Sequence, residues 1–130
     1  MTVSFDTNVV LRLFIKENPK QSLAATSALE RYDQIQISDI AIIETIYALA
    51  HYYNLGRSAA CHYVSSLLSH PKINCNRPLF KEAMSLYEKH PALSIEDCVL
   101  STYAHLNNAA PLLTFDKKLA NQVDHTQLLT

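Results

Sequence analysis

Residues 2–8 read TVSFDTN, a short stretch with Val3 and Phe5 that ends in an aspartate before Thr7 and Asn8. Residues 2–5 predict a first strand, because β-branched and aromatic side chains favour extended backbone. Residues 8–16 predict a helix whose inner face holds Val9 and Leu13 and can extend to Val10 and Phe14. A strand that leads directly into a helix is typical of an α/β unit, and the acid between them stands at the carboxyl end of the strand.

The same alternation continues along the chain. Short segments at 35–37, 72–75, 112–115 and 126–129 predict further strands. Further helices are predicted over residues 19–32, 39–53, 58–68, 79–87, 94–107 and 117–121. No hairpin dipeptide such as Asn-Gly joins the strands. The pattern therefore predicts an α/β fold, a three-layer α/β/α sandwich with a central parallel sheet.

Length and composition restrict the function. A chain of 130 residues fits one domain, predicted over residues 1–130. The single glycine, Gly56, excludes a glycine-rich phosphate loop or dinucleotide fingerprint. No apolar run reaches the roughly 18 residues of a membrane span, and no secretion signal is evident at the N-terminus. The cysteines Cys61, Cys75 and Cys98 lack metal-type spacing, so we expect reduced thiols and a cytoplasmic protein.

Three aspartates lie at the starts of predicted helices, two of them just after a strand. Asp6 and Asp116 each follow a predicted strand, and Asp97 lies three residues after Ser94 at the start of a helix. Each has a structural interpretation: Asp6 and Asp116 as helix N-caps, and Asp97 as part of a capping box opened by Ser94. Taken singly, these positions favour the structural interpretation.

Glu44 is harder to explain by structure alone. Between Asp39 and Arg57 it is the only side chain charged at neutral pH, and isoleucines surround it. An acid on a helix that is apolar nearly all round is predicted to be partly buried, and burial of an unpaired carboxylate is costly. The alternative is a surface stripe that Glu44 shares with His51 or Asn54.

The four acids together favour a catalytic interpretation. In an open parallel sheet the carboxyl ends of the strands meet at one edge, and Asp6 and Asp116 stand at such ends. Glu44 lies within two turns of the second strand and Asp97 in the first turn of the helix before the last-but-one strand, so a doubly wound fold can bring all four into one pocket. Four carboxylates in one pocket need cations, and oxygen ligands suit Mg²⁺ or Mn²⁺. Such ions can hold a phosphodiester and activate water for its hydrolysis. The net charge of −1 is not that of a strongly basic nucleic-acid binder, but the rest of the chain is mildly cationic once the four acids are neutralised.

Four short motifs resemble the PIN-domain family, and more narrowly VapC-type toxins. They are Asp6-Thr7-Asn8 after a strand, Glu44 on the third helix, Ser94-Ile95-Glu96-Asp97, and Thr114-Phe115-Asp116-Lys117-Lys118-Leu119. The resemblance covers nearly the whole chain and implies an Mg²⁺- or Mn²⁺-dependent endoribonuclease inhibited by a VapB-like antitoxin. It also implies a homodimer, the four acids as metal ligands, and support from Asn8 and Thr114. The spacing from Ser94 favours Asp97 over Glu96 as the ligand.

Other side chains have two interpretations. Arg12, Lys16, Lys117 and Lys118 are predicted to contact RNA phosphates, or equally to form a solvated charged face. Tyrosines can stack on bases, but apolar neighbours favour a core position for three of them, Tyr47, Tyr63 and Tyr87. The six histidines show no ligand spacing and are predicted to be structural or superficial.

Three other functions compete with this prediction. A phosphoacceptor receiver domain would need adjacent acids after the first strand, whereas Phe5 and Thr7 flank Asp6. A non-catalytic PIN-like binding module is disfavoured because all four acids are present. A PIN nuclease that processes RNA without being a toxin remains the main alternative, and a neighbouring antitoxin gene would separate the two.

Overall fold

The computed structural model describes all 130 residues. The chain forms two compact units, Met1–Asn76 and Arg77–Thr130, and each is described below by itself. A single domain over residues 1–130 stays a prediction. None of the helices has the length and apolar character needed to cross a membrane.

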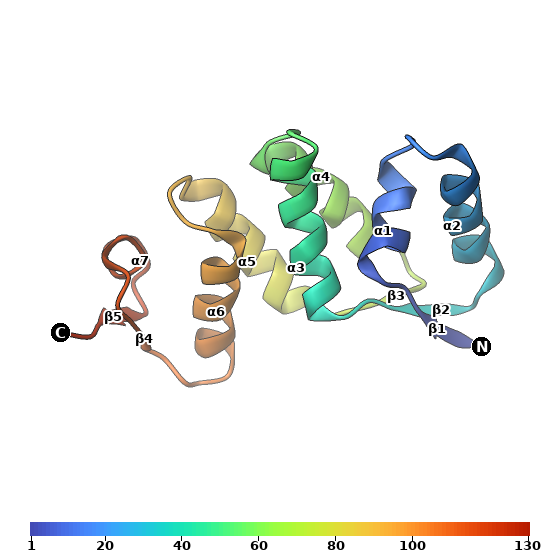
Figure 1. Cartoon of the computed structure of the whole chain (residues 1–130). Coiled ribbons are helices and arrows are strands. Elements are labelled where there is room, and N and C mark those ends of the chain that lie inside the picture. Colours follow the sequence, from blue (N-terminus) through green and yellow to red (C-terminus); the bar gives the residue numbers. More distant parts are fainter. The chain divides into compact units, whose positions relative to one another are not determined.

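The first unit is a three-stranded parallel sheet with its helices (Figure 1). Its elements in chain order are β1 (Thr2–Ser4), α1 (Thr7–Phe14), α2 (Pro19–Arg31), β2 (Gln34–Gln36), α3 (Asp39–Tyr47), a π-helix η1 (Ala48–Tyr52), α4 (Arg57–Leu68) and β3 (Ile73–Asn74). The strand order is β1-β2-β3, and helices form each connection between neighbouring strands. Because the strands are parallel, the carboxyl ends of β1 and β2 lie at the same edge.

Apolar side chains fix the register of this sheet. Val3 pairs with Ile35, which pairs in turn with Ile73. Ile35 and Ile73 are fully buried, as is Ile37 just beyond β2. A shift of one residue would turn these isoleucines toward solvent, so their burial specifies the pairing.

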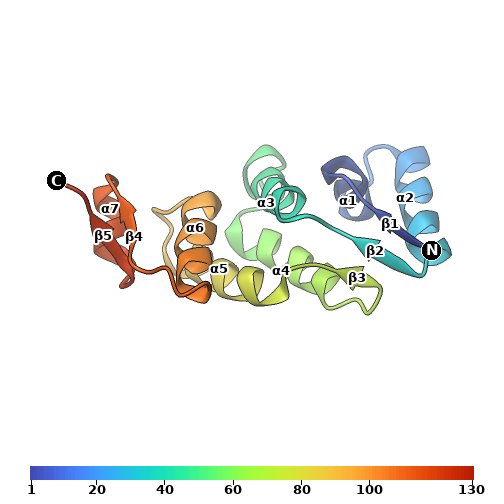
Figure 2. The ribbon, with the colours of Figure 1, turned by 90° about the horizontal axis from the view of Figure 1, so that it is seen from below.

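Helices α1 and α2 begin at side-chain caps, of which Asp6 was predicted from the sequence and Asn18 was not. The side chain of Asp6 accepts a hydrogen bond from the amide of Val9, and that of Asn18 accepts one from Gln21. Pro19 occupies the first turn of α2, where its missing amide proton costs nothing. The two helices lie side by side in both ribbon views (Figures 1 and 2).

The helix predicted over residues 39–53 is not α-helical throughout. It is α-helical to Tyr47 and then widens into the π-helix Ala48–Tyr52. The amide of Tyr53 donates to the carbonyl of Ala48 at 2.9 Å, five residues back, which defines the wider turn. A wider turn changes the phase of the helix without changing its apolar composition, so periodicity alone does not detect it.

The second unit is smaller and has its own parallel pair of strands. Its elements are α5 (Arg77–Lys89), α6 (Ile95–Leu106), β4 (Leu112–Thr114), α7 (Lys117–Gln122) and β5 (Thr126–Leu128). Buried residues of α5 and α6, among them Phe80, Tyr87 and Cys98, contribute to its core. Strands β4 and β5 pair in parallel, so every strand pairing in both units is parallel, as the sequence predicted.

Candidate active site

Asp6 lies two residues after the end of β1 and is the N-cap of α1. Its Oδ1 accepts the Val9 amide at 2.9 Å, so the helix-capping interpretation is confirmed. The other oxygen, Oδ2, makes no hydrogen bond within the protein, and the residue is exposed. Capping therefore uses only one carboxylate oxygen of Asp6, and the second oxygen is available to bind a cation.

Glu44 lies in the second turn of α3 and is held from α1. The Thr7 hydroxyl donates to Glu44 Oε1 at 2.7 Å, across 37 residues of sequence. The prediction that Glu44 is partly buried is wrong: the residue is exposed, because Ala41, Ile42, Thr45 and Ile46 form the buried face of α3. The Thr7 hydrogen bond fixes a side chain that would otherwise sample many rotamers.

Asp6 and Glu44 line the same pocket of about 360 Å³. Its wall comes from the end of β1 and the start of α3, namely Ser4, Phe5, Asp6, Thr7, Ser38, Ile40, Ala41 and Glu44. The structure therefore brings together two of the four predicted acids from segments nearly 40 residues apart. The sequence did not predict that Thr7 would hydrogen-bond to Glu44. The position of Thr7 next to Asp6 is the only sequence feature that indicated it.

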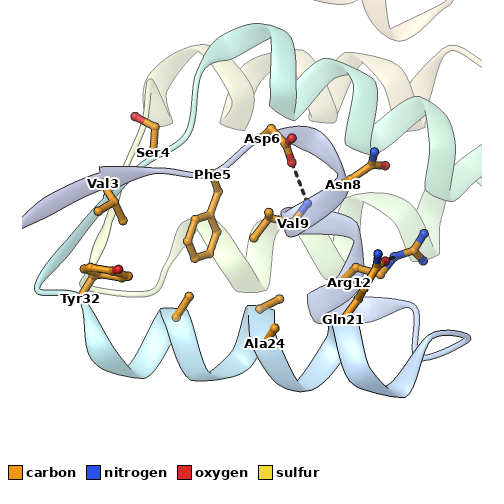
Figure 3. A pocket seen from close by; sticks show the side chains of 12 residues that line it. Val3, Ser4, Phe5, Asp6, Asn8, Val9, Arg12, Gln21, Ala24 and Tyr32 are labelled. Carbon is orange, nitrogen blue, oxygen red and sulfur yellow. Dashed lines mark hydrogen bonds between the residues drawn. The ribbon is translucent and has the colours of Figure 1, made fainter.

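A second pocket of about 490 Å³ lies between β1, α1 and α2 and is also lined by Asp6 (Figure 3). Its floor is largely apolar and includes Val3, Phe5, Val9, Ala24, Ala25, Ala28 and Tyr32. Asp6 and Asn8 lie at one part of its rim, and Arg12 and Gln21 lie at another (Figure 3). The pocket offers apolar surface within reach of the candidate site.

Arg12, a predicted RNA contact, already has partners within the first unit. Its Nε donates to Gln21 Oε1 at 3.0 Å and its Nη1 donates to Glu17 Oε1 at 3.1 Å. Hydrogen bonding with Tyr53, and less strongly with Glu17, raises the pKa of Arg12 above its ordinary value. The side chain is only 17% exposed, so its charge is directed into this network. Lys16 is exposed to solvent.

Asp97 and Asp116 lie in the second unit. Ser94 caps α6 by accepting the Asp97 amide at 3.1 Å, and Asp97 is half-buried while Glu96 is exposed. The choice of Asp97 over Glu96 as the ligand stays a prediction. The Asp97 carboxylate makes no hydrogen bond within the protein.

Asp116 repeats the arrangement seen at Asp6. Its Oδ1 accepts the amides of Lys118 at 2.9 Å and Leu119 at 3.2 Å, so it caps α7. The Thr114 hydroxyl accepts the Asp116 amide at 3.0 Å and so holds the backbone at this strand end, while its role as a supporting site residue stays a prediction. Lys117 and Lys118 are exposed beside it.

The donor chemistry of these residues fits a hard divalent cation. Asp6, Glu44 and Asp116 each keep one carboxylate oxygen without a protein hydrogen bond, and Asp97 keeps both. Carboxylate oxygens are the ligands that Mg²⁺ and Mn²⁺ prefer. Neither unit by itself gathers three or more acidic, histidine or cysteine side chains around one point.

Comparison with known proteins places the chain in a family. The PIN domain matches residues 3–124, so the chain belongs to the PIN domain family. The predicted fold class, the α/β/α architecture of a PIN domain, is confirmed with that membership. No curated protein matches the chain.

Two solved structures are similar over the whole chain. One is a toxin–antitoxin complex from Klebsiella pneumoniae, with 19% identity over 100% of this chain and 97% of that chain, and a TM-score of 0.36. The other is VapBC2 from Rickettsia felis bound to a DNA fragment from its promoter, with 16% identity over 99% and 98% of the two chains, and a TM-score of 0.41. Because identities and TM-scores are low, family membership rests on the domain match.

Proposed function

We propose that this PIN domain is a metal-dependent endoribonuclease, the VapC-type toxin of a toxin–antitoxin pair. PIN domains are generally nucleases that use divalent metals. The observation that carries the proposal is the pocket in which Asp6 and Glu44 meet, with Thr7 bonded to Glu44. Two carboxylates at the carboxyl end of a parallel sheet match the chemistry of phosphodiester hydrolysis.

The proposed metal ligands are the four acids predicted from the sequence, Asp6, Glu44, Asp97 and Asp116. When bound, Mg²⁺ or Mn²⁺ would polarise the phosphate and lower the pKa of a coordinated water. The helix caps and the Thr7 hydrogen bond would fix the orientation of the carboxylates, so that they would move little when the metal binds. Asn8 and Thr114 are proposed as supporting residues.

Exposed lysines, rather than Arg12, are proposed to contact the phosphates of the RNA backbone. Lys16, Lys117 and Lys118 are exposed, and Lys117 and Lys118 follow Asp116 directly. Their ammonium groups suit phosphate oxygens. Arg12 was predicted in the same role, but its hydrogen bonds to Glu17 and Gln21 favour a structural contribution.

A VapB-like antitoxin is the proposed partner. The 490 Å³ pocket offers it an apolar floor, and Leu23, on another side of α2, is 69% exposed. An inhibitor segment that packs there could also present a basic side chain to Asp6, since the pocket reaches that carboxylate. A homodimer and a cytoplasmic location are proposed with it, and the location fits the thiols of Cys61, Cys75 and Cys98.

RNA cleavage in the presence of Mn²⁺ tests this proposal. Wild-type protein should cut single-stranded RNA with Mn²⁺ and should not do so in excess chelator. Expression of the chain alone should arrest growth, and co-expression of the adjacent reading frame should restore it. Cleavage without growth arrest would favour an RNA-processing PIN nuclease, and metal binding without cleavage would favour a non-catalytic module.

A further inference from the structure

One face of α3 and η1 carries a stripe of exposed side chains that begins at the candidate site. Ile40, Glu44, Tyr47 and His51 follow one another at intervals of four, three and four residues, which places them on one side of a helix. Ile40 and Glu44 line the carboxylate pocket, and Tyr47 and His51 continue beyond it. The stripe is therefore continuous with the pocket.

The sequence predicted Tyr47 to be in the core, and that prediction is wrong. Tyr47 is 53% exposed, since Thr45 and Ile46 take the buried positions of this turn. Its ring lies 5.0 Å from that of His51, at an interplanar angle of 45°. Because the rings are tilted, a planar ligand can stack face to face on one ring and meet the other at an angle, and either contact covers apolar surface that otherwise faces water.

The backbone beneath this pair is firmly anchored. Leu49 and Ala50, between the two rings in sequence, are buried. The π-helical bond from Tyr53 to Ala48 closes the same turn. Single-turn π-helices are frequent at functional sites. A rigid base under the rings lowers the entropy lost when a ligand packs on them.

We propose that Tyr47 and His51 form a stacking platform for an unpaired nucleobase of the RNA, next to the phosphodiester that the carboxylates act on. The inference rests on the proposed function and adds a binding site for one base of the RNA, outside the carboxylates. Duplex bases are already stacked in the helix, whereas single strands present their faces to aromatic side chains. Tyr47 lies three residues after Glu44, about 4.5 Å along a helix, so base and phosphate of one nucleotide can reach the two residues together.

The size of the pair also favours a base over a protein partner. A stable protein interface covers roughly 800 Å² of each partner. The exposed area of one tyrosine and one histidine is instead about the size of a single nucleobase. The nearby carboxylate pocket supplies chemistry for a phosphodiester, which a protein partner does not carry.

RNA affinity measured under conditions that prevent cleavage tests the stacking platform separately from catalysis. The protein would carry Asp6→Asn and be held in chelator, and binding of a fluorescein-labelled single-stranded RNA would be followed by anisotropy. Tyr47→Leu should weaken binding by about tenfold, the scale of one stacked base, whereas Tyr47→Trp should preserve it. Tyr52→Leu is the matched control, because Tyr52 is 75% exposed but packs on Tyr53 rather than His51.

An abasic scan of the RNA identifies the stacked base. Loss of one base should weaken binding to protein with Tyr47, and the same change should have little further effect on Tyr47→Leu. Equal RNA affinities with and without the Tyr47→Leu substitution would overturn the proposal. The proposal would also be overturned if Tyr47→Leu changed the oligomeric state seen by sedimentation but left RNA affinity unchanged. That result would show that Tyr47 contacts a second protein chain.

Failure of the proposed function gives a different result. If wild-type protein does not cut RNA with Mn²⁺ but its RNA affinity depends on Tyr47, the nuclease proposal fails and the platform stands. If wild-type protein cuts RNA and Tyr47→Leu binds and cuts equally well, the platform fails and the nuclease proposal stands.

Discussion

Two strand ends in this protein, after β1 and after β4, have the same local design but different surroundings. In both, an aspartate follows a parallel strand and caps the next helix, Asp6 for α1 and Asp116 for α7. At the first end the neighbouring Thr7 reaches across to Glu44, and the two acids share a pocket. At the second end the neighbouring hydroxyl of Thr114 accepts the backbone amide of Asp116 itself.

This difference separates what a helix cap explains from what it does not. A cap needs one carboxylate oxygen, and at both ends Oδ1 supplies it. A cap does not require a second acid at the same pocket or a hydroxyl aimed at that acid. The first strand end therefore carries features beyond capping, and they can be tested one at a time.

The largest expected effect is on RNA cleavage. Asp6→Asn or Asp97→Asn should reduce Mn²⁺-dependent cleavage by roughly a hundredfold or more, because a ligand charge is lost while an amide still fills the space. Glu96→Gln is the matched control for Asp97, since it removes an adjacent exposed acid, and it should cleave normally. If Glu96→Gln is the inactive variant, Asp97 has been given the wrong role.

The next effect concerns the contact that distinguishes the two strand ends. Thr7→Val removes the donor to Glu44 and should lower cleavage and Mn²⁺ affinity by roughly tenfold, as loss of a group supporting a metal ligand does. Thr7→Ser keeps the hydroxyl and should restore both. Equal behaviour of the valine and serine variants would show that the hydrogen bond has no functional role.

A smaller effect, on stability, should be shared by both strand ends. Asp6→Ala and Asp116→Ala should each lower the free energy of unfolding by about 1 kcal/mol, because the helix amides lose their acceptor. The corresponding asparagine variants keep an oxygen acceptor and should stay close to wild type. Urea unfolding without metal measures all four. An asparagine variant as unstable as the alanine one would rule out capping as the source.

The smallest effect lies away from both strand ends. The α-amino group of Met1 contacts Asp33 at 2.6 Å and lowers the pKa of Asp33 below its ordinary value. A lowered carboxyl pKa stabilises the fold above the unfolded-state pKa, and that contribution is lost as the pH falls through the folded-state value. Between about pH 5 and about pH 3, wild type should therefore lose slightly more stability than Asp33→Asn. Parallel pH curves for the two proteins would contradict this.

The alternation of strands and helices was predictable because its signals are local. A strand that ends in Asp6, a capping Ser94 and the absence of hairpin dipeptides are each visible within a few residues, and the structure has these caps and parallel pairings. The four motifs in series also led to the correct family.

The orientation of α3 was not predictable in the same way. Isoleucines occur on several sides of this helix, so apolar periodicity does not define its buried face, and Glu44 and Tyr47 were both placed too deep. The π-helix that follows is defined by a single wider turn. The Thr7–Glu44 hydrogen bond joins residues 37 apart and exists only once the sheet has formed.

Titration of Mn²⁺ into wild type, Asp6→Asn, Glu44→Gln and the double variant tests the central claim most directly. If both carboxylates hold the same ion, each single substitution should weaken Mn²⁺ binding clearly, and the double variant should lose less than the sum of the two losses in binding free energy. Calorimetry at one pH, with unfolding temperatures as a folding control, gives the four affinities. Unchanged Mn²⁺ affinity in the single variants, or losses that add in full, would contradict a shared metal site at the first strand end.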